Sequence, residues 1–341
     1  MNLAVVILNW NGRDLLKEFL PAVIINSTDC ANIYVIDNGS TDDSIDVLKN
    51  EFPSVKIIEL KENYGFAQGY NLGLQSVDEE YYVILNSDVM VEKNWLKGID
   101  SYFEQHPQVA ALQPTLLDYR EKDFFEYAGA SGGFIDRNGF VFCDGRIFNH
   151  IEKTADRKAK EIFWASGAAL IIRKEVFKEV RGFDPDFFAH MEEIDLCWRI
   201  KNKGYQIWYY PSSKVFHLGG GTLGKLKPKK TYLNFRNNLF LLTKNYFQGS
   251  LLLKIFWRMV LDGIAAWKFL FQGNPLHFLA VGRAHFHFYL NLPKFLKKRA
   301  QLKKETSKPN LIGLYQGNIV FDYFLRGKKY FKDLDQSRFR T

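Results

Sequence analysis

The chain has 341 residues, of which 47% are hydrophobic, and it carries a formal net charge of +8 at pH 7. This length allows one large domain with an extension, or two domains. The three cysteines are odd in number and no pair has metal-ligand spacing, which favours free thiols in a reducing compartment over a disulfide framework. No stretch reaches the roughly 18 uncharged apolar residues that a membrane-spanning helix needs.

The charge is unevenly distributed along the chain. Residues 224–341 contain 23 Lys and Arg but 5 Asp and Glu, a balance of +18, whereas residues 1–223 contain 23 basic and 33 acidic residues, a balance of −10. We expect the acidic front part and the basic, aromatic-rich back part to face different partners. A basic surface of this kind suits nucleic acid, a membrane surface or an acidic substrate.

Strands and helices are predicted to alternate over the first 120 residues. Apolar runs of strand length occupy residues 3–10, 32–37, 55–60 and 81–86. The first of four predicted helices begins at about residue 13, and the other three cover residues 41–50, 66–76 and 93–104. Ser40 or Thr41 is the expected N-cap of the second helix, with Asp42 and Asp43 in its first turn. Continuous Val, Ile and Leu strands between helices predict a parallel sheet that is covered on both faces.

The middle of the chain, from about residue 105 to 220, has a less regular pattern. A hairpin is predicted around Asp144-Gly145, and an apolar strand that leads into a helix is predicted within residues 162–177. From about residue 229 the pattern becomes long, helical and basic. We therefore divide the chain into an α/β domain, residues 1–228, and a basic amphipathic helical extension, residues 229–341.

Polar residues follow the end of each of the four predicted strands. In open parallel sheets, ligands bind beyond the carboxyl ends of the strands. The residues at those ends are Asn9, Asn11 and Gly12; Asp37, Asn38, Gly39 and Ser40; the segment ENYGFAQGYNLG at 62–73; and Asn86, Ser87 and Asp88. Each group alone is also what ordinary turns contain. The glycine motifs of dinucleotide-binding folds and of P-loops are both missing from the sequence.

Seven segments along the chain carry a resemblance to a known family. They are VVILNWNG, VIDNGSTDDS, ENYGFAQGYNLGL, ILNSDV, WASGAALIIRKEVFKEVRGFDPDFF, EEIDLCWR and FRNNLFLL, in this order. Together, over about residues 3–245, they resemble the inverting family 2 glycosyltransferases of GT-A fold, in the bacterial rhamnosyltransferase-like branch. The resemblance implies a Rossmann-like, mostly parallel central sheet flanked by helices, and transfer of a sugar from a nucleotide-diphosphate sugar to a hydroxyl group.

The resemblance also implies where the donor binds. Asp37, with residues around Asn9 and Asn63, would hold the base and ribose. The expected nucleotide-sugar-binding residues at the strand ends are Asn9, Asn11, Asp37, Asn38, Asn63, Gly69, Asn71, Asn86 and Ser87. Trp164, Ser166 and Gly167 would line the sugar or acceptor pocket, and a closely packed buried strand is the alternative. Arg236 would contact a phosphate, and a solvated helix face is the alternative.

The D-x-D motif of the family falls on Asn86-Ser87-Asp88, where Asn replaces the first acid. By resemblance, Asp88 would reach a divalent metal, Mg²⁺ or Mn²⁺, on the diphosphate, and His217 matches a position where some relatives supply a further ligand. Such a cation offsets the charge of the leaving diphosphate, and one carboxylate plus substrate phosphates is a normal Mg²⁺ environment. The Asn at position 86 leaves the need for metal open, and a structural role is the alternative for His217.

Three acids lie at the predicted start of a helix: Glu192, Glu193 and Asp195. The helix macrodipole alone would stabilise each by roughly 0.3–1 kcal/mol, and Asp195 can pair with Arg199 one turn later. An inverting transfer needs a general base beside the acceptor hydroxyl, and a carboxylate at the mouth of an apolar pocket has a suitably raised pKa. The second acid of the family's pattern is the base, which selects Glu193, with Glu192 and Asp195 as alternatives.

The basic tail combines aromatic side chains with cations, as helices at membrane interfaces do. The candidate anchors are Phe256, Trp257, Trp267, Phe269 and Phe271, and the densest cations are Lys294, Lys297, Lys298, Arg299, Lys303 and Lys304. A helical subdomain packed on the core and a homodimer interface are the alternatives. No signature of a nucleic-acid-binding module is present, so nucleic acid is not an expected partner.

The sequence therefore predicts a cytoplasmic glycosyltransferase, peripheral on the inner face of the cell membrane, that extends a lipid-linked or polysaccharide acceptor in surface-glycan synthesis. One alternative is a sugar nucleotidyltransferase, which would need a glycine-rich basic loop where this chain has NWNGRDLLK. A second alternative is a non-catalytic, nucleotide-binding relative, which the Asn at position 86 keeps open.

Overall fold

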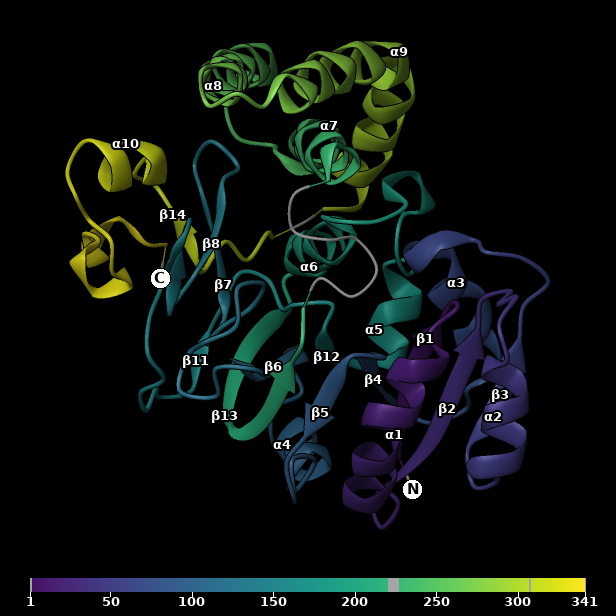
Figure 1. Ribbon diagram of the computed structural model, residues 1–341. Coiled ribbons are helices and arrows are strands. Elements are labelled where there is room, and N and C mark those ends of the chain that lie inside the picture. The colour runs from purple at the N-terminus through teal and green to yellow at the C-terminus, as the bar shows by residue number, and fades with distance from the viewer. Residues whose placement is uncertain (1, 220–226, 307, 341) are drawn as a thin grey trace.

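The structure is a computed structural model that describes residues 2–219, 227–306 and 308–340. Its central sheet has the strand order β11-β13-β6-β12-β4-β1-β2-β3, and β5 pairs with β13 (Figure 1). The parallel strands β1 to β4 are Leu3–Asn9, Ala31–Asp37, Lys56–Glu59 and Tyr81–Asn86. The others are β5 (Val89–Val91), β6 (Val109–Asp118), β11 (Lys160–Glu161), β12 (Ala169–Arg173) and β13 (Gln206–His217). The predicted α/β fold is confirmed.

Both faces of the central sheet are buried because its strands are apolar on both sides. In β1, Leu3, Val5 and Ile7 pack into one apolar cluster, whereas Ala4 and Val6 pack into the other. Successive side chains of a strand point to opposite faces, so a continuous apolar run needs cover on both. The first cluster is covered by α1 (Arg13–Ser27), α2 (Ser44–Glu51) and α4 (Ile99–Gln105). The second includes α3 (Gly65–Gly73), α5 (Lys174–Glu179) and α6 (Glu192–Asn202), and helices from the end of the chain also contribute to it.

The second helix begins later than predicted. α2 starts at Ser44 rather than Thr41, and neither Ser40 nor Thr41 caps it. The Ser40 hydroxyl instead accepts hydrogen bonds from the Asn9 side chain (3.3 Å) and the Asn11 amide (2.9 Å). Because Ser40 is committed to the end of the neighbouring strand, it cannot satisfy the first amides of α2.

The fourth helix is also shorter than predicted. α4 starts at Ile99 rather than Lys93, and residues 93–98 form turns. Gly98 has φ 78°, a left-handed conformation that interrupts a helix. Trp95 is buried in this turn, and its indole N–H donates to Ser27 Oγ (3.0 Å). Long-range burial of one tryptophan therefore outweighs the helical pattern of this segment.

A second, smaller sheet lies beside the first, with the order β10-β9-β8-β7-β14 (Figure 1). Its strands are β7 (Gly133–Asp136), β8 (Val141–Cys143), β9 (Arg146–Ile147), β10 (His150–Ile151) and β14 (Leu314–Tyr315). The predicted hairpin is confirmed: Cys143 pairs with Arg146, and Gly145 takes the left-handed conformation of the turn, with φ 99°. β14 comes from the end of the chain and runs parallel to β7.

Three helices follow the sheets: α7 (Pro228–Asn245), α8 (Leu251–Phe271) and α9 (Pro275–Glu305). α7 lies between α6 and the pair formed by α8 and α9, so the helical extension rests on the α/β part (Figure 1). After α9 the chain returns to the second sheet as β14 and continues into α10 (Ile319–Phe324). Across the described ranges, no helix is both long and apolar enough to cross a membrane.

A buried network of charges joins α6 to α7 and α9. Asp195 Oδ2 accepts from Arg199 Nε (2.8 Å), which confirms the predicted pair, and from Lys244 Nζ of α7 (2.8 Å). Lys244 also donates to Asp184 (2.6 Å), as does Lys298 of α9 (2.6 Å). Although burial opposes ionisation, Lys244 and Lys298 hold the pKa of Asp184 well below its usual value. The network therefore fixes the extension to the segment around α6.

Replacing Lys244 should destabilise the protein strongly. Lys244→Met leaves two buried carboxylates without a shared cation, and breaking a buried pair in this way typically costs about 3–5 kcal/mol. The free energy of unfolding from urea titration measures this. The control is Lys17→Met, whose partner Glu51 is exposed, and it should cost less than about 1 kcal/mol. Equal effects of the two substitutions would contradict the role of the network.

Candidate active site

The ends of β1 and β2 carry a connected cluster of polar side chains. Parallel pairing puts Asn9 opposite Asp37, and both side chains are buried. Asn9 Nδ2 donates to Asp37 Oδ1 (3.1 Å), and the Ser40 amide donates to Asp37 Oδ2 (2.9 Å). Asn11 is exposed beside them and accepts from the Thr41 amide (2.7 Å). Three predicted donor residues thus lie together, and their contacts with a nucleotide stay a prediction.

Asn38 connects this cluster to the loop before α3. Its side-chain Nδ2 donates to Asn63 Oδ1 (3.1 Å), and its side-chain Oδ1 accepts from the Tyr64 backbone amide (3.0 Å). Gly69 lets α3 come close, because a Cβ at that position would lie 3.1 Å from Asn38 Nδ2. Asn38, Asn63 and Gly69 are therefore at the same edge of the sheet as Asp37, as the sequence predicted.

The loop before α6 is strained and lies against this edge. Phe188, His190 and Met191 have φ of 63°, 68° and 71°, in a region where L-residues are costly. The Phe188 carbonyl accepts from the Phe66 amide (3.2 Å), and the Phe188 ring lies against Gly65. Such strain persists where neighbouring groups hold it and is enriched at functional sites.

Two neighbouring side chains of α7 hold this loop. Asn237 Nδ2 donates to the carbonyls of Phe187 (2.9 Å), Ala189 (2.9 Å) and His190 (2.7 Å). Arg236 is half-buried and also donates to the Phe187 carbonyl (3.2 Å). Arg236 is therefore not on a solvated helix face, and its predicted phosphate contact stays a prediction. The sequence drew attention to Arg236 but did not reveal that its partners, and those of Asn237, are backbone carbonyls.

Glu192 and Glu193 begin α6 directly after the strained loop. Glu192 is 6% exposed and Glu193 is half-buried, and Oε2 of each is buried without a partner in the described part of the chain. Burial raises the pKa of Glu193 to about 7. Burial, and then the charge of Glu193, raise the pKa of Glu192 well above its usual value. A carboxyl group that titrates near neutral pH can serve as a general base, and Glu193 is the more exposed of the two.

Glu193 lies beside the segment that follows Trp164. A Cβ added to Gly167 would be 3.6 Å from Glu193 Cβ, so the absence of a side chain there lets α6 approach. The next carbonyl, that of Ala168, accepts from the Asn86 amide (3.0 Å). One short segment therefore separates Glu193 from the end of β4, where Asn86 and the half-buried Ser87 lie.

Four other predicted site residues are buried or hydrogen-bonded to other parts of the protein. Trp164 and Ser166 are buried, and the Trp164 indole N–H donates to a backbone carbonyl (2.8 Å), as in the alternative of a closely packed strand. Asn71 exchanges hydrogen bonds with the backbone of Phe183 (2.8 and 2.9 Å). Asp195 is fully buried in the charge network, so its oxygens are occupied by Arg199, Lys244 and an amide. Of the three acids that were candidates for the general base, only Glu192 and Glu193 remain, and we call these two the acidic pair.

Asp88 and His217 meet at the ends of β4 and β13. The antiparallel pairing of β5 with β13 puts His217 opposite Val89, and His217 Nε2 lies 3.2 Å from Asp88 Oδ1. His217 Nδ1 lies 3.3 Å from Oε1 of Glu126, a residue that the sequence analysis missed because it stands in an irregular loop. Burial opposes protonation, but the two carboxylates raise the pKa of His217 to about 10.

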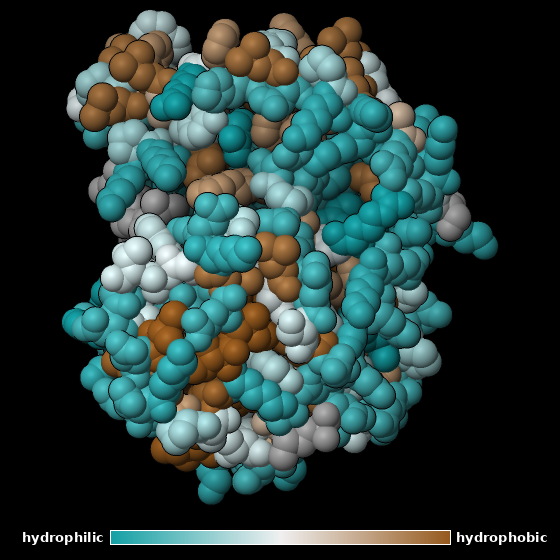
Figure 2. All heavy atoms as spheres, turned by 90° about the vertical axis from the view of Figure 1, so that its right-hand side faces the viewer, coloured by the Kyte–Doolittle hydropathy of each residue, from teal (hydrophilic) through white to brown (hydrophobic). Residues whose placement is uncertain are grey.

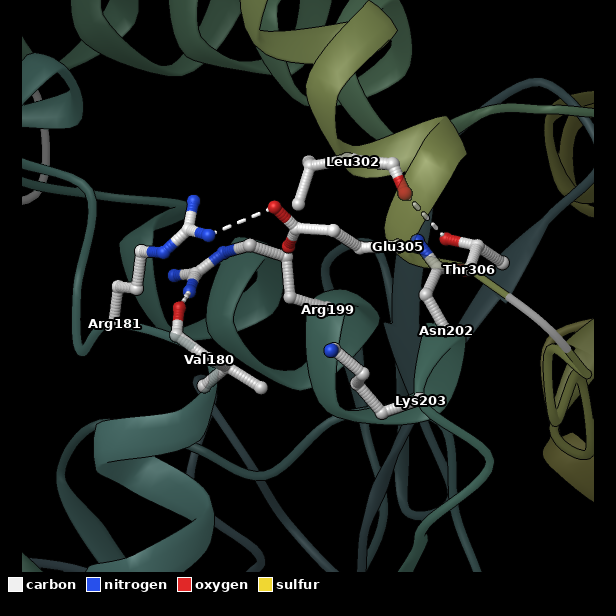
Figure 3. A pocket seen from close by; sticks show the side chains of 8 residues that line it. All are labelled: Val180, Arg181, Arg199, Asn202, Lys203, Leu302, Glu305 and Thr306. Atoms are coloured by element: carbon white, nitrogen blue, oxygen red, sulfur yellow. Dashed lines mark hydrogen bonds and ion pairs between the residues drawn. The ribbon is translucent and has the colours of Figure 1, made fainter.

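The small cavity in Figure 3 lies elsewhere, between α6 and the end of α9. Its lining includes Arg199, Asn202 and Glu305, and its volume is about 20 Å³. A water molecule needs at least roughly 10–15 Å³, so this space is too small for a sugar or a nucleotide. The ion pair of Arg181 with Glu305 (2.8 Å) ties α9 to the core at this point. The cavity is therefore a packing feature.

The central sheet and the helices that cover it have the GT-A fold. The fold is similar to that of the mannosyltransferase PcManGT from Pyrobaculum calidifontis, solved with GDP-Man and Mn²⁺, with a TM-score of 0.54, 15% identity, and coverage of 89% of this chain and 85% of that one. It is also similar to GalNAc-T7, solved with UDP, GalNAc and Mn²⁺, with a TM-score of 0.58, 16% identity, and coverage of 89% and 57%.

The chain belongs to glycosyl transferase family 2, whose sequence model matches residues 4–181, more than half of the chain. It is 23% identical over 248 residues to the N-acetylglucosaminyl-diphospho-decaprenol L-rhamnosyltransferase of Mycobacterium tuberculosis, which covers 65% of this chain and 78% of that protein. It is 25% identical over 163 residues to the rhamnosyltransferase WbbL of Escherichia coli K12, which covers 45% and 61%. The predicted family is confirmed, and the family favours glycosyl transfer over the nucleotidyltransferase alternative.

Removing the side chain of Asn237 should loosen the strained loop. Asn237→Ala loses three hydrogen bonds to buried carbonyls, so the free energy of local opening should fall by about 1–3 kcal/mol. Hydrogen exchange of peptides covering residues 184–195 should then become about 5- to 150-fold faster. The matched control is Asn238→Ala, because Asn238 bonds Gly139 and Arg258 instead of the loop. Unchanged exchange in Asn237→Ala, or an equal change in both, would contradict this role.

Proposed function

We propose that the chain is an inverting glycosyltransferase that moves one sugar from a nucleotide-diphosphate sugar to a hydroxyl group of a lipid-linked or polysaccharide acceptor in surface-glycan synthesis. The similarity to an enzyme named for a diphospho-decaprenol substrate supports the acceptor class. The sugar nucleotide bound to PcManGT supports the donor class. The observation that carries the proposal is the strained loop that holds Glu193, with its pKa raised to about 7, against the donor edge of the sheet.

In this mechanism the acceptor oxygen attacks the anomeric carbon of the donor sugar. The bond from that carbon to the diphosphate breaks, the nucleoside diphosphate leaves with the electron pair, and the proton of the acceptor hydroxyl passes to the Glu193 carboxylate. Attack from the side opposite the leaving group inverts the anomeric centre. Burial and the charge of Glu193 raise the pKa of Glu192 as well, but Glu192 is the more buried of the two, so Glu193 is the one that an acceptor hydroxyl can reach.

A divalent cation, Mg²⁺ or Mn²⁺, fits Asp88 and His217. A carboxylate and an imidazole converge within 3.2 Å, although the part of the chain that the structure describes holds no group of three such ligands. Two protein ligands suffice where substrate phosphates and water complete the shell. Asp88 and His217 would hold the cation after His217 has lost to it the proton that the raised pKa keeps on the ring, and the bound cation would offset charge on the leaving diphosphate. Glu126, on the other ring nitrogen, would orient His217.

We further propose that residues 1–228 carry the chemistry and that the extension, residues 229–341, places the enzyme on the cytoplasmic face of the cell membrane. The basic balance of the extension and the lipid-linked substrate in the name of the relative support this location. Through α7 the extension also holds the strained loop, so both parts contribute to one active site. A homodimer is the competing use of the same helices.

A thermal-shift screen of nucleotides and nucleotide sugars should identify the donor class. One diphosphate sugar at 100 times its Kd should stabilise the protein by about 2.7 kcal/mol. Part of the shift should require Mn²⁺, and Asp88→Asn should remove that part because a neutral amide binds the cation weakly. A lack of response to every nucleotide would favour the non-catalytic alternative. A full response without Mn²⁺ would contradict the metal site.

Replacing Glu193 should remove transfer while sparing donor binding. Glu193→Gln keeps the shape of the side chain but cannot accept the proton, so transfer should fall by about 10²–10⁴-fold. The measurement is incorporation of labelled sugar, from the donor found in the screen, into a membrane extract. The wild-type rate should rise with pH through about 7 and then level off, because the base must be ionised. Glu192→Gln is the control and should stay active, and an active Glu193→Gln variant would exclude Glu193 as the base.

A further inference from the structure

One face of α8 is apolar and exposed along its whole length. Its side chains recur every three or four residues, which places them on one side of the helix. They are Leu253, Trp257, Val260, Ile264, Trp267 and Phe271, and each is between 37% and 83% exposed. The opposite side of α8 carries Ile255, Arg258, Asp262 and Ala266, which are buried against the rest of the protein. We call the exposed set the α8 stripe. It is a fully formed helix face that no other part of the described chain covers.

The stripe continues onto the neighbouring helix. Trp267 contacts the ring of Phe278 in α9 (centroids 5.3 Å apart), and exposed Leu276 and Leu279 lie on either side of Phe278 in the sequence. Tyr289 of α9 donates to the sulfur of Met259 in α8 (3.3 Å). Figure 2 shows hydrophobic side chains gathered at the top of the molecule, where α8 and α9 lie in Figure 1. An exposed apolar surface of this extent marks an interaction site.

The charges around the stripe are cations. Asp262 is the only acid between residues 251 and 304, and it is buried and paired with Arg258 (2.8 Å). Lys268 of α8 and Arg283 of α9 are exposed. Exposed aromatic and aliphatic side chains with cations beside them are what an anionic lipid surface binds, since the rings enter the acyl boundary and the cations meet the headgroups.

An open pocket adjoins the N-terminal end of the stripe. Its volume is about 260 Å³, and Asn138, Tyr246, Ser250, Leu253, Lys254 and Trp257 line it. Two of these residues belong to the stripe, and the others offer an amide, a hydroxyl, an ammonium group and a phenol. Tyr and Trp with one apolar and one polar side are typical of membrane interfaces. The pocket therefore provides polar groups at the level where headgroups would lie.

A second copy of the chain fits this face less well. A two-fold dimer presses the same patch against itself, so the cations of one α8–α9 pair would face the cations of the other. Because residues 251–304 contain one acid, and that acid is buried, no opposite charge is available to offset them. An anionic bilayer supplies that charge.

We propose that the α8 stripe, with the first turns of α9, docks on the surface of an anionic lipid bilayer. This deepens the proposed function, on which it rests for the location of the acceptor. Docking would also position the catalytic loop, because Lys294 and Lys298 of α9 bind Asp186 (2.5 and 2.6 Å) directly before it. Ion pairs therefore connect the helix pair that would contact lipid to the segment directly before the loop that leads to Glu193.

Flotation of the full-length protein with vesicles tests the proposal. The chain should float with vesicles of phosphatidylcholine and phosphatidylglycerol, and much less with phosphatidylcholine alone. Added salt should weaken binding without abolishing it, since only the electrostatic part is screened. The triple variant Trp257→Ser, Trp267→Ser, Phe271→Ser should lower the partition coefficient by at least about tenfold. The control is Ile25→Ser, at a 75% exposed side chain of α1, which should bind like the wild type.

Three results would overturn the proposal. The wild type could fail to float with either kind of vesicle, or the triple variant could float as well as the wild type. The wild type could also be a dimer that binds no lipid, with the triple variant a monomer. Sedimentation of the same samples detects the last. The thermal shift with nucleotide sugars, measured on the triple variant, should equal that of the wild type because the stripe is remote from Asp37. If the wild type does not float but still responds to a nucleotide sugar, the docking proposal fails and the enzyme proposal stands. If the wild type floats but responds to no nucleotide, the enzyme proposal fails and the docking proposal stands.

Discussion

The buried contact of Lys244 with Asp184 and Asp195 joins two parts of the chain that carry opposite charge. A cation and two anions without water are costly to bury unless each finds a close partner, so the contact has one satisfactory geometry. That geometry sets α7 against α6, and α7 then presents Asn237 to the loop before Glu192. The position of the acidic pair is thus a consequence of a charge network that contains neither member of the pair.

The chemistry proposed for Glu193 depends on two costs that the fold offsets together. Left-handed conformations at Phe188, His190 and Met191 are unfavourable, and so is the burial of carboxylate oxygens without partners. Hydrogen bonds from α7 compensate for the first, and retention of a proton relieves the second. The raised pKa is therefore the direct result of placing an acid where neither an ion pair nor water can stabilise its charge fully. Asp195, two residues later, shows the contrasting outcome, since Arg199 and Lys244 supply that stabilisation.

What the sequence could predict was local. Apolar runs located the strands of the central sheet, the acids marked the start of α6, and the Asp144-Gly145 turn located a hairpin. The ordered family segments then singled out Asp37, Asp88 and Glu193 as site residues, and their roles stay predictions. The predictions that failed, and the features that the sequence did not reveal, depend on contacts between residues far apart in the chain. The start of α4 moved because of a buried tryptophan, and β14 pairs with a strand about half the chain away, Leu314 with Ile135. Glu126 and the loop contacts of Asn237 have no local signal, since a carboxylate or an amide in a sequence does not reveal which distant atom it will bind.

The basic balance of the extension divides into an inner and an outer part with different physical roles. Lys244, Lys298 and Arg258 are directed inward, where each has a carboxylate at close range and contributes to folding. Lys268, Arg283 and Lys297 remain outside, where their field is felt at a distance and is screened by salt. The α8 stripe, in contrast, can attract a partner only through direct apolar contact, and salt does not screen that attraction. In the proposed docking, such a surface would separate attraction to an anionic bilayer from insertion into it, so that the stripe and not the net charge would set the orientation.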